Sequence, residues 1–419
     1  MSCAKDFDSI FADSTLRVDY ILAGNAQGTT IALQDMQKSA GWWGRRVNID
    51  SAPVRGNAQI AVVDKHDGDT LYCMPFSTLF QEWLTSDEVQ SVTRAMEGTM
   101  LLPLPREDVY VVITLFDDFA KTAVESRFPY SPSDVNIRMI NGEASNRHEY
   151  LHYSGDPKNK IDVAILGEGY SLSEMELLKE HGKTAVESIL AHEPFKSMSD
   201  RFNFVLVETP STQSGVSVPQ NGKWTQSALM SQYNTFYSPR YLTTQATHLI
   251  HDALRGIPYE HVIILANDDV YGGGGIFNFY TLTTARNKDF KPVVVHEFGH
   301  SFGGLADEYF YENDVLTDIY PVDVEPWEGN ITTLVDFDRK WAPMLKGKFN
   351  GTNINLSLIS NGVGVFEGGG YRTHGIYRPV DRDCRMRFNT APAFCPVCQE
   401  VIANMIEFYT QPQVVKSTK

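Results

Sequence analysis

The sequence has 419 residues, of which 42% are hydrophobic, and it contains no low-complexity tract or evident repeat. This length is enough for two domains that each bury a core, and this composition excludes extended disorder. The formal net charge of −16 argues against nucleic acid and anionic membrane surfaces as partners. No apolar stretch approaches the roughly 18 residues that a membrane-spanning helix needs, so we expect no transmembrane segment.

The amino-terminal residues leave two interpretations open. The first four residues contain neither the charged region nor the apolar region of a signal peptide, so we expect none in this sequence. Cys3 is either the lipid-bearing residue of a processed bacterial lipoprotein or an ordinary surface cysteine. The first interpretation predicts a lipid anchor and a position outside the cytoplasm.

Residues 8–140 have the pattern of an accessory β-sandwich domain. Short segments alternate between apolar and polar residues, as half-buried strands do: 16–22, 29–33, 59–63 and 109–115. Residues 77–83 and 88–96 are expected to form short helical insertions. The pair Trp42-Trp43 is more typical of core packing than of a binding surface. Whether this domain binds a glycan or a protein, or only supports the rest of the chain, stays open.

Residues 141–155 form a polar stretch that we expect to link the first domain to a second one at 156–412. Helix and strand signals alternate in the second domain, with strands expected at 161–166, 202–207 and 261–266 and helices at 173–191 and 243–255. This order predicts an α+β protein whose second domain has a mixed sheet, helices packed behind the sheet and a functional cleft.

A run of four glycines, residues 272–275, resembles the loops that bind phosphate but lacks their other features. No Lys-Ser or Lys-Thr pair follows the run, and residues 276–282 have the composition of a strand rather than of a helix start. The residues from Gly274 to Ile276 therefore belong either to a strand or to a flexible surface loop.

The segment His296-Glu297-Phe298-Gly299-His300 carries the clearest chemistry in the chain. On a helix, residues four apart project from the same face, so His296 and His300 can bind one metal ion. Glu297 lies about 100° around the helix, where it can act as a general base on water at that ion. The alternative is a buried helix whose histidines donate to backbone carbonyls.

Catalytic zinc usually has three protein ligands and keeps its fourth position for water. Gly303-Gly304 can turn the chain out of the helix, because glycine accepts positive φ. The nearest residues that could then return as a third ligand are Asp307 and Glu308. We expect Asp307 to bind the metal and Glu308 to point elsewhere, where it could orient a ligand imidazole. A site ligated by Glu308 is the alternative.

Three of the five cysteines, Cys384, Cys395 and Cys398, lie in the last forty residues. A structural zinc site would need a fourth ligand, which the sequence does not reveal. We expect a disulfide from Cys384 to Cys395 or Cys398 in preference to free thiols, and this favours a location outside the cytoplasm. Residues 399–409 have the apolar spacing of a closing helix.

The string 296–309 is similar to the bacterial peptidase family named after immunoglobulin A peptidase, as are the segments 160–170, 271–276 and 375–379. The resemblance covers roughly residues 156–412. It implies a metzincin-like zinc-peptidase domain whose ligands are His296, His300 and Asp307. The usual metzincin spacing would instead place a histidine where Ala306 stands.

The resemblance also implies roles for residues outside the metal site. Met386 would form the methionine turn beneath the ligands. The alternative is an ordinary core methionine, which would make nearly the same packing contacts. The residues Gly274, Gly275 and Ile276 would form an edge strand that pairs with an extended substrate. Tyr377 would donate a hydrogen bond to the oxyanion of the tetrahedral intermediate.

The function that we expect is zinc-dependent endopeptidase activity on extracellular proteins, with Glu297 as the general base. Zinc is the expected cofactor, and a protein or peptide is the expected substrate. The alternative is a surface protein that binds a glycan or a protein through its sandwich and whose peptidase domain is vestigial. The intact Glu297 argues against this alternative.

Overall fold

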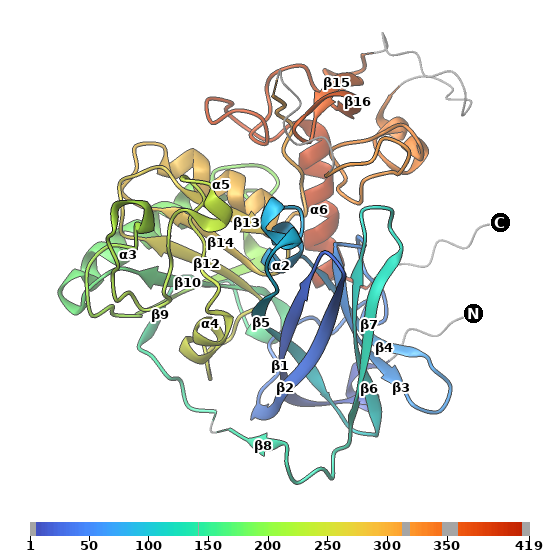
Figure 1. Cartoon of the computed structure of the whole chain (residues 1–419), viewed down its shortest axis with the longest axis vertical. Helices are drawn as coiled ribbons and strands as arrows, with labels where there is room; N and C mark the ends of the chain where they lie inside the picture. Colours follow the sequence, from blue (N-terminus) through green and yellow to red (C-terminus); the bar gives the residue numbers. More distant parts are fainter. Residues whose placement is uncertain (1–5, 141, 312–318, 346–358, 413–419) are drawn as a thin grey trace.

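The computed structural model describes residues 6–140, 142–311, 319–345 and 359–412, so Cys3 and the first residue of the expected linker lie outside the described residues. The amino-terminal part contains two four-stranded sheets (Figure 1), with strand orders β5-β1-β2-β8 and β4-β3-β6-β7. The elements are α1 (Phe7–Ile10), β1 (Phe11–Asn25), β2 (Gly28–Ala40), β3 (Ala58–Asp64), β4 (Thr70–Phe76), α2 (Leu79–Trp83), β5 (Arg94–Pro105), β6 (Val109–Phe116), β7 (Thr122–Tyr130) and β8 (Arg138–Met139).

The two sheets bury their apolar faces in one cluster, as a sandwich requires. Alternate residues of β1 are buried, and they pack in the same cluster as alternate residues of β3 and β6: Leu16, Val18, Tyr20, Leu22, Ile60, Val62, Val111 and Ile113. Trp42 is buried in this cluster and donates to the Arg45 carbonyl at 3.2 Å, so it has the core role expected for it.

The helix expected at residues 88–96 is wrong. Only a 3-10 turn forms there (Asp87–Gln90), and the strand β5 begins at Arg94. The strand β5 pairs antiparallel with β1, with Met96 opposite Leu22 and Met100 opposite Val18. Cross-strand pairing therefore outweighs the local helical pattern, because it places both methionines in the sandwich core.

The second part of the chain is built on a six-stranded mixed sheet with the order β13-β14-β12-β10-β11-β9. The four inner strands are parallel, and the edge strands β9 and β13 are antiparallel to their neighbours. The elements are β9 (His148–His152), β10 (Ile161–Glu168), α3 (Met175–Leu190), β11 (Phe202–Val207), α4 (Thr247–Ala253), β12 (His261–Ala266), β13 (Gly273–Ile276), β14 (Tyr280–Thr284), α5 (Phe290–Ser301), β15 (Phe366–Gly369), β16 (Arg372–Arg378) and α6 (Pro396–Thr410).

This arrangement confirms the α+β class and the mixed sheet, and it corrects details of two expected elements. The expected strand at 276–282 is a hairpin, because residues 277–279 turn the chain between β13 and β14. The expected helix at 243–255 is shorter, with bounds Thr247–Ala253. The metzincin-like relationship of this domain stays a prediction.

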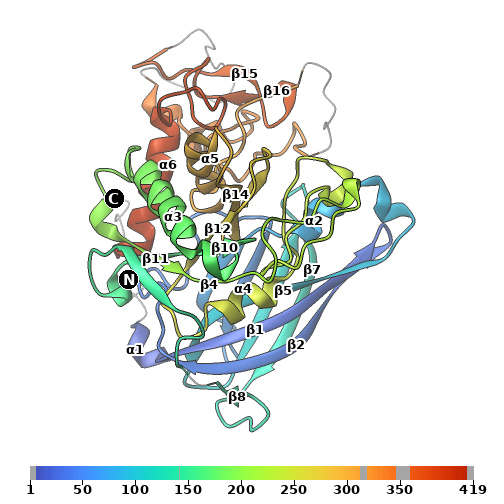
Figure 2. The same cartoon turned by 90° about the vertical axis from the view of Figure 1, so that its left-hand side faces the viewer.

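Both faces of the mixed sheet are covered, but by different parts of the chain. Figure 2 shows α3, α5 and α6 on one side of the sheet and the strands β1 and β2 on the other. On β10, Val163 and Ile165 pack with the helices, whereas Ala164 and Leu166 belong to the same buried cluster as the sandwich. The inner strands are buried on both faces and therefore read as continuous apolar runs in the sequence.

Hydrogen bonds also join the two parts. The Ser77 amide donates to the Phe277 carbonyl at 2.9 Å, and the Asn278 side chain donates to the Pro75 carbonyl at 2.7 Å. Arg17 of β1 forms an ion pair of 2.5 Å with Asp252 of α4. The sandwich thus shares its core with the second domain. No helix in the described parts of the chain is long and apolar enough to span a membrane.

The shared core makes a prediction about truncation. A fragment of residues 156–412 lacks the sandwich and exposes the apolar face of the sheet that includes Ala164 and Leu166. We expect this fragment to aggregate, while the full chain expressed in the same way elutes as a single species in size-exclusion chromatography. A soluble fragment that cleaves small peptides would show instead that the sandwich is only accessory.

Candidate metal centre

The helix α5 holds the two candidate histidine ligands on the side away from its buried residues. Val294, Val295 and Phe298 of α5 pack into the core with α3, and this packing leaves His296 and His300 only partly buried. Because the two histidines are one helical turn apart, their rings lie together, and the two Nε2 atoms are 3.0 Å from each other.

The turn after α5 returns the chain to the histidines. Gly304 has φ of 61°, the left-handed conformation that closes a helix, and its amide donates to the His300 carbonyl at 3.0 Å. The Leu305 carbonyl then accepts a hydrogen bond of 2.6 Å from His300 Nδ1. Gly304 therefore lies where the sequence predicts a break in the helix, and Asp307 follows three residues later.

The three candidate ligands meet at one point. Asp307 Oδ1 lies 3.0 Å from His296 Nε2 and 3.2 Å from His300 Nε2. The three residues can each offer one ligand atom to a common ion. Structural and catalytic zinc sites use the same types of ligand atom.

Hydrogen bonds on the opposite ring atoms orient both histidines. The Nδ1 atom of His296 donates to the Arg385 carbonyl at 2.9 Å, as that of His300 does to Leu305. A carbonyl oxygen accepts but cannot donate, so each Nδ1 carries the hydrogen and each neutral ring presents the lone pair of Nε2 to the site. Such outer hydrogen bonds are typical of metal-binding histidines.

The two oxygens of Asp307 have different surroundings. The Tyr371 hydroxyl donates to Oδ2 at 2.5 Å, whereas Oδ1 is buried, faces the two imidazoles and has no other partner. Burial alone would raise the pKa of Asp307, but the charges and hydrogen bonds of His300 and His296 outweigh it and hold this pKa well below its usual range. The donor set and the orphaned oxygen fit a divalent cation.

The negative charge of Asp307 also acts on the histidines. Burial lowers the pKa of His300, but the Asp307 carboxylate more than offsets this and raises that pKa to about 9. The same charge that retains a proton on the imidazole would favour a metal ion in the proton's place, since metal ligands must be deprotonated.

Glu297 is the only glutamate on α5, and its environment suits a base. Burial raises the pKa of its carboxyl, and the positive charges of His296 and His300 oppose this rise. The backbone of Gly275 in the strand β13 also lowers this pKa. The strand β13 packs closely against α5, because an alanine Cβ at Gly275 would lie only 2.1 Å from the Glu297 carbonyl oxygen.

Met386 packs against the helix that carries the histidines, and its role as a methionine turn stays a prediction. It is fully buried, and its sulfur would be 2.8 Å from a Cβ at Gly299, the residue before His300. Its carbonyl accepts a hydrogen bond of 2.9 Å from the Glu308 amide. These two contacts connect Met386 to α5 and to the segment that follows it.

The residues expected to bind the substrate backbone and the oxyanion lie in two different strands. Gly274, Gly275 and Ile276 lie in β13, which is the edge of the sheet nearest to α5 and pairs only with β14 among the described strands. Tyr377 lies in β16, where its backbone pairs with Thr332. No hydrogen bond of the described residues joins its hydroxyl to the candidate ligands, and both roles stay predictions.

Two family models match the chain over most of its length. The model described as IgA Peptidase M64 matches residues 150–355, which include His296, His300 and Asp307, and the model described as Peptidase M64 N-terminus matches residues 6–129. The chain belongs to the IgA peptidase M64 family. Membership supports a peptidase function, and peptidases of this family are metallopeptidases. No curated protein matches the chain.

The M64 chain also contains a second group of metal-ligand residues, and this group corrects two expectations. Cys384, Cys395 and Cys398 are free thiols, with 3.7 Å between the sulfurs of Cys384 and Cys398, so the expected disulfide is wrong. Glu308 is fully buried and points at these cysteines rather than at an imidazole. The hydrogen bonds that orient the imidazoles come from backbone carbonyls instead.

Sequence reasoning missed two residues that shape the site. Tyr371 holds Asp307, and Asn330 clamps the preceding residue: its side chain accepts from the Ala306 amide at 2.8 Å and donates to the Ala306 carbonyl at 2.9 Å. Neither has a local motif, because both reach the site from loops distant in the sequence. Only the fold places them.

The contact of Tyr371 with Asp307 leads to a prediction. We expect Tyr371→Phe to lower the affinity of the site for a divalent metal ion roughly 10- to 100-fold, because the carboxylate loses the hydrogen bond that orients it. Titration with a competing chelator would measure this loss. Tyr311→Phe is the matched control, because Tyr311 stacks on Tyr371. Equal affinities in both variants would contradict the role of Tyr371.

Proposed function

We propose that this M64 peptidase is a zinc-dependent endopeptidase whose metal ligands are His296, His300 and Asp307. The observation that carries the proposal is the position of Asp307 Oδ1, 3.0 Å and 3.2 Å from the two Nε2 atoms, because it assembles the three-ligand set of catalytic zinc sites. When bound, zinc would acidify water and polarise the scissile carbonyl.

The residues of the chain supply the remaining steps. Glu297 would take a proton from the attacking water and then give it to the leaving amine, which requires a carboxyl that can both accept and donate. The raised pKa of Glu297 favours this double role, because a base works best when its pKa approaches the working pH. We retain Tyr377 as a proposed oxyanion donor only on the family resemblance.

The edge strand β13 is the proposed binding site for the substrate backbone. An extended peptide can add a strand to a sheet edge by main-chain hydrogen bonds. The ring of Tyr241 packs against Gly274 in β13, and its hydroxyl donates to Glu82 of α2. The sandwich domain thus contributes to the surroundings of this edge, and a glycan-binding or protein-binding role for it stays a proposal.

The location and the natural substrate are also proposals. The family is named for immunoglobulin A, a secreted protein, and this name supports extracellular proteins as substrates and a position outside the cytoplasm. The disulfide that would have added support is not formed. Fold-level similarity does not determine specificity, so a survey of cleavage sites in a peptide library is the appropriate measurement.

The role of Glu297 is directly testable. We expect Glu297→Gln to lower kcat by at least about 100-fold, because the amide cannot take up the proton of water. Its zinc content should equal that of the unsubstituted chain, since Glu297 acts on water and not on the metal.

Glu176→Gln is the matched control, because Glu176 is an exposed glutamate on the neighbouring helix α3. Loss of zinc in Glu297→Gln would mean that Glu297 is a ligand. Absence of any hydrolysis by the unsubstituted, zinc-loaded chain would favour the alternative of a binding protein with a vestigial site.

A further inference from the structure

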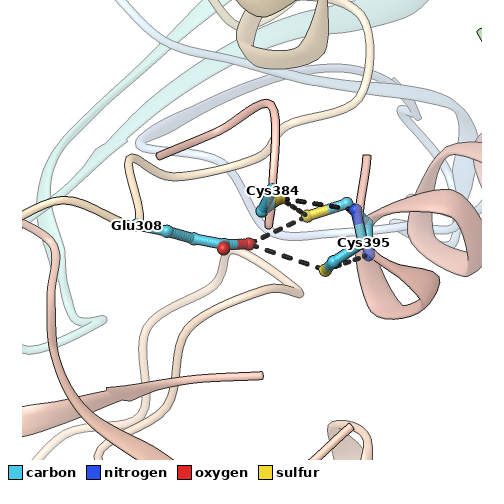
Figure 3. Close-up of side chains that lie close together, drawn as sticks. Glu308, Cys384 and Cys395 are labelled. Atoms are coloured by element: carbon cyan, nitrogen blue, oxygen red, sulfur yellow. Dashed lines mark hydrogen bonds between the residues drawn. The ribbon is translucent and has the colours of Figure 1, made fainter. Parts of the chain in front are cut away.

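A second group of four possible metal ligands lies in the interior, apart from the histidines. Figure 3 shows the Glu308 carboxylate facing the sulfur of Cys395, with Cys384 beside them. Cys398 completes the group, and all four ligand atoms lie within 4.8 Å of one another. The four residues come from three segments: the chain after α5, the turn before Met386 and the start of α6.

The distances within this group are those of a tetrahedral metal site. The sulfurs of Cys384 and Cys398 are 3.7 Å apart, and Glu308 Oε1 lies 3.0 Å from Cys398 Sγ and 3.8 Å from Cys395 Sγ. A zinc ion with Zn–S bonds of about 2.3 Å and tetrahedral angles separates two sulfurs by about 3.8 Å. The distance between the sulfurs of Cys384 and Cys398 is therefore close to that in a zinc site, and the other two ligand atoms lie within 4.8 Å of them.

The Glu308 carboxyl has one buried oxygen without a partner. Glu308 is fully buried, its Oε2 atom has no hydrogen-bond partner, and none of the ion pairs of the described residues involves it. An ionised carboxylate in such surroundings is costly unless a positive charge compensates it. The Asn330 side chain donates to Oε1 at 3.2 Å but carries no charge.

The start of α6 directs backbone N–H groups at two of the sulfurs. Cys395 is the N-cap of α6, and its Sγ accepts a hydrogen bond of 3.5 Å from the Cys398 amide. The Cys395 amide in turn donates to Cys384 Sγ at 3.4 Å. Amide donors and a helix N-terminus both stabilise the anionic sulfur that metals bind.

We propose that Glu308, Cys384, Cys395 and Cys398 bind a structural zinc ion. Four protein ligands close the site, and closure distinguishes structural zinc from catalytic zinc, which keeps a position for water. All four residues are buried, with exposed fractions of at most 2%. Soft thiolates together with tetrahedral geometry favour zinc over calcium or magnesium.

The proposed ion would also position the peptidase site. Glu308 directly follows Asp307, and its amide donates to the Met386 carbonyl at 2.9 Å. Cys384 directly precedes Arg385, whose carbonyl accepts from His296 Nδ1 at 2.9 Å. The structural ion would thus fix the backbone next to Asp307 and next to the Arg385 carbonyl that orients His296, so Glu308 and Cys384 are positioning residues.

The first test measures the metal content of full-length chains that lack the histidine site. In His296→Ala/His300→Ala, we expect about one zinc ion per chain after dialysis, bound by the cysteine group. Adding Cys395→Ser should remove this ion, while serine still serves as the N-cap of α6. Adding Cys73→Ser instead is the matched control, because Cys73 is a buried thiol outside the group, and zinc should remain.

A second test needs no substitution of a cysteine. Cobalt(II) bound to His296→Ala/His300→Ala should show the charge-transfer absorption of thiolate ligands, a signal that a site of histidine and aspartate cannot give. Alkylation of the denatured chain without reductant should modify Cys384, Cys395 and Cys398. A disulfide among these cysteines, or a double variant without zinc and without the cobalt signal, would overturn the proposal.

The positioning role has its own measurement. In the chain with intact histidines, Cys395→Ser should lower the zinc affinity of the peptidase site roughly 10- to 100-fold, while Cys73→Ser leaves it unchanged. An unchanged affinity would overturn the positioning role. These outcomes are distinct from failure of the proposed peptidase function, because every readout here is metal content, absorption or thiol modification rather than hydrolysis.

Discussion

The meeting of Asp307 with His296 and His300 is the contact on which the rest of the site depends. The histidines precede the turn at Gly304 and Asp307 follows it. The contact places a buried oxygen of Asp307 at 3.0 Å and 3.2 Å from the two Nε2 atoms. Such a carboxylate is costly without positive charge beside it. The carboxylate raises the pKa of His300 to about 9, and a divalent ion bound by the same three residues would supply positive charge in place of a proton.

The surrounding structure holds this contact from three directions. The core of α3, α5 and α6 fixes the helix that carries the histidines, Met386 packs beneath that helix, and Tyr371 holds the outer oxygen of Asp307. The sandwich covers the opposite face of the sheet and lies beside the edge strand β13 through the contact of Glu82 with Tyr241. The two domains therefore form one structural unit around the site.

The proposed structural zinc would also constrain the position of Asp307. Asp307 and Glu308 are neighbours in the sequence, yet their side chains point into different groups of ligands. A short segment that is anchored at both residues has little freedom to move. If the second ion is bound, the peptidase site inherits rigidity from a metal that takes no part in hydrolysis.

The elements that depend on neighbouring residues can be predicted from the amino-acid sequence. Continuous apolar runs predict the strands β10, β11 and β12. The spacing of His296 and His300 predicts the helix α5, and Gly304 predicts its end. Features that depend on distant residues become visible only in the folded chain. The strand β5 forms because β1 pairs with it, and Glu308 lies beside three cysteines that are far from it in the sequence. Local patterns carry helical and strand periodicity, but not which distant segments the burial of apolar surface brings together.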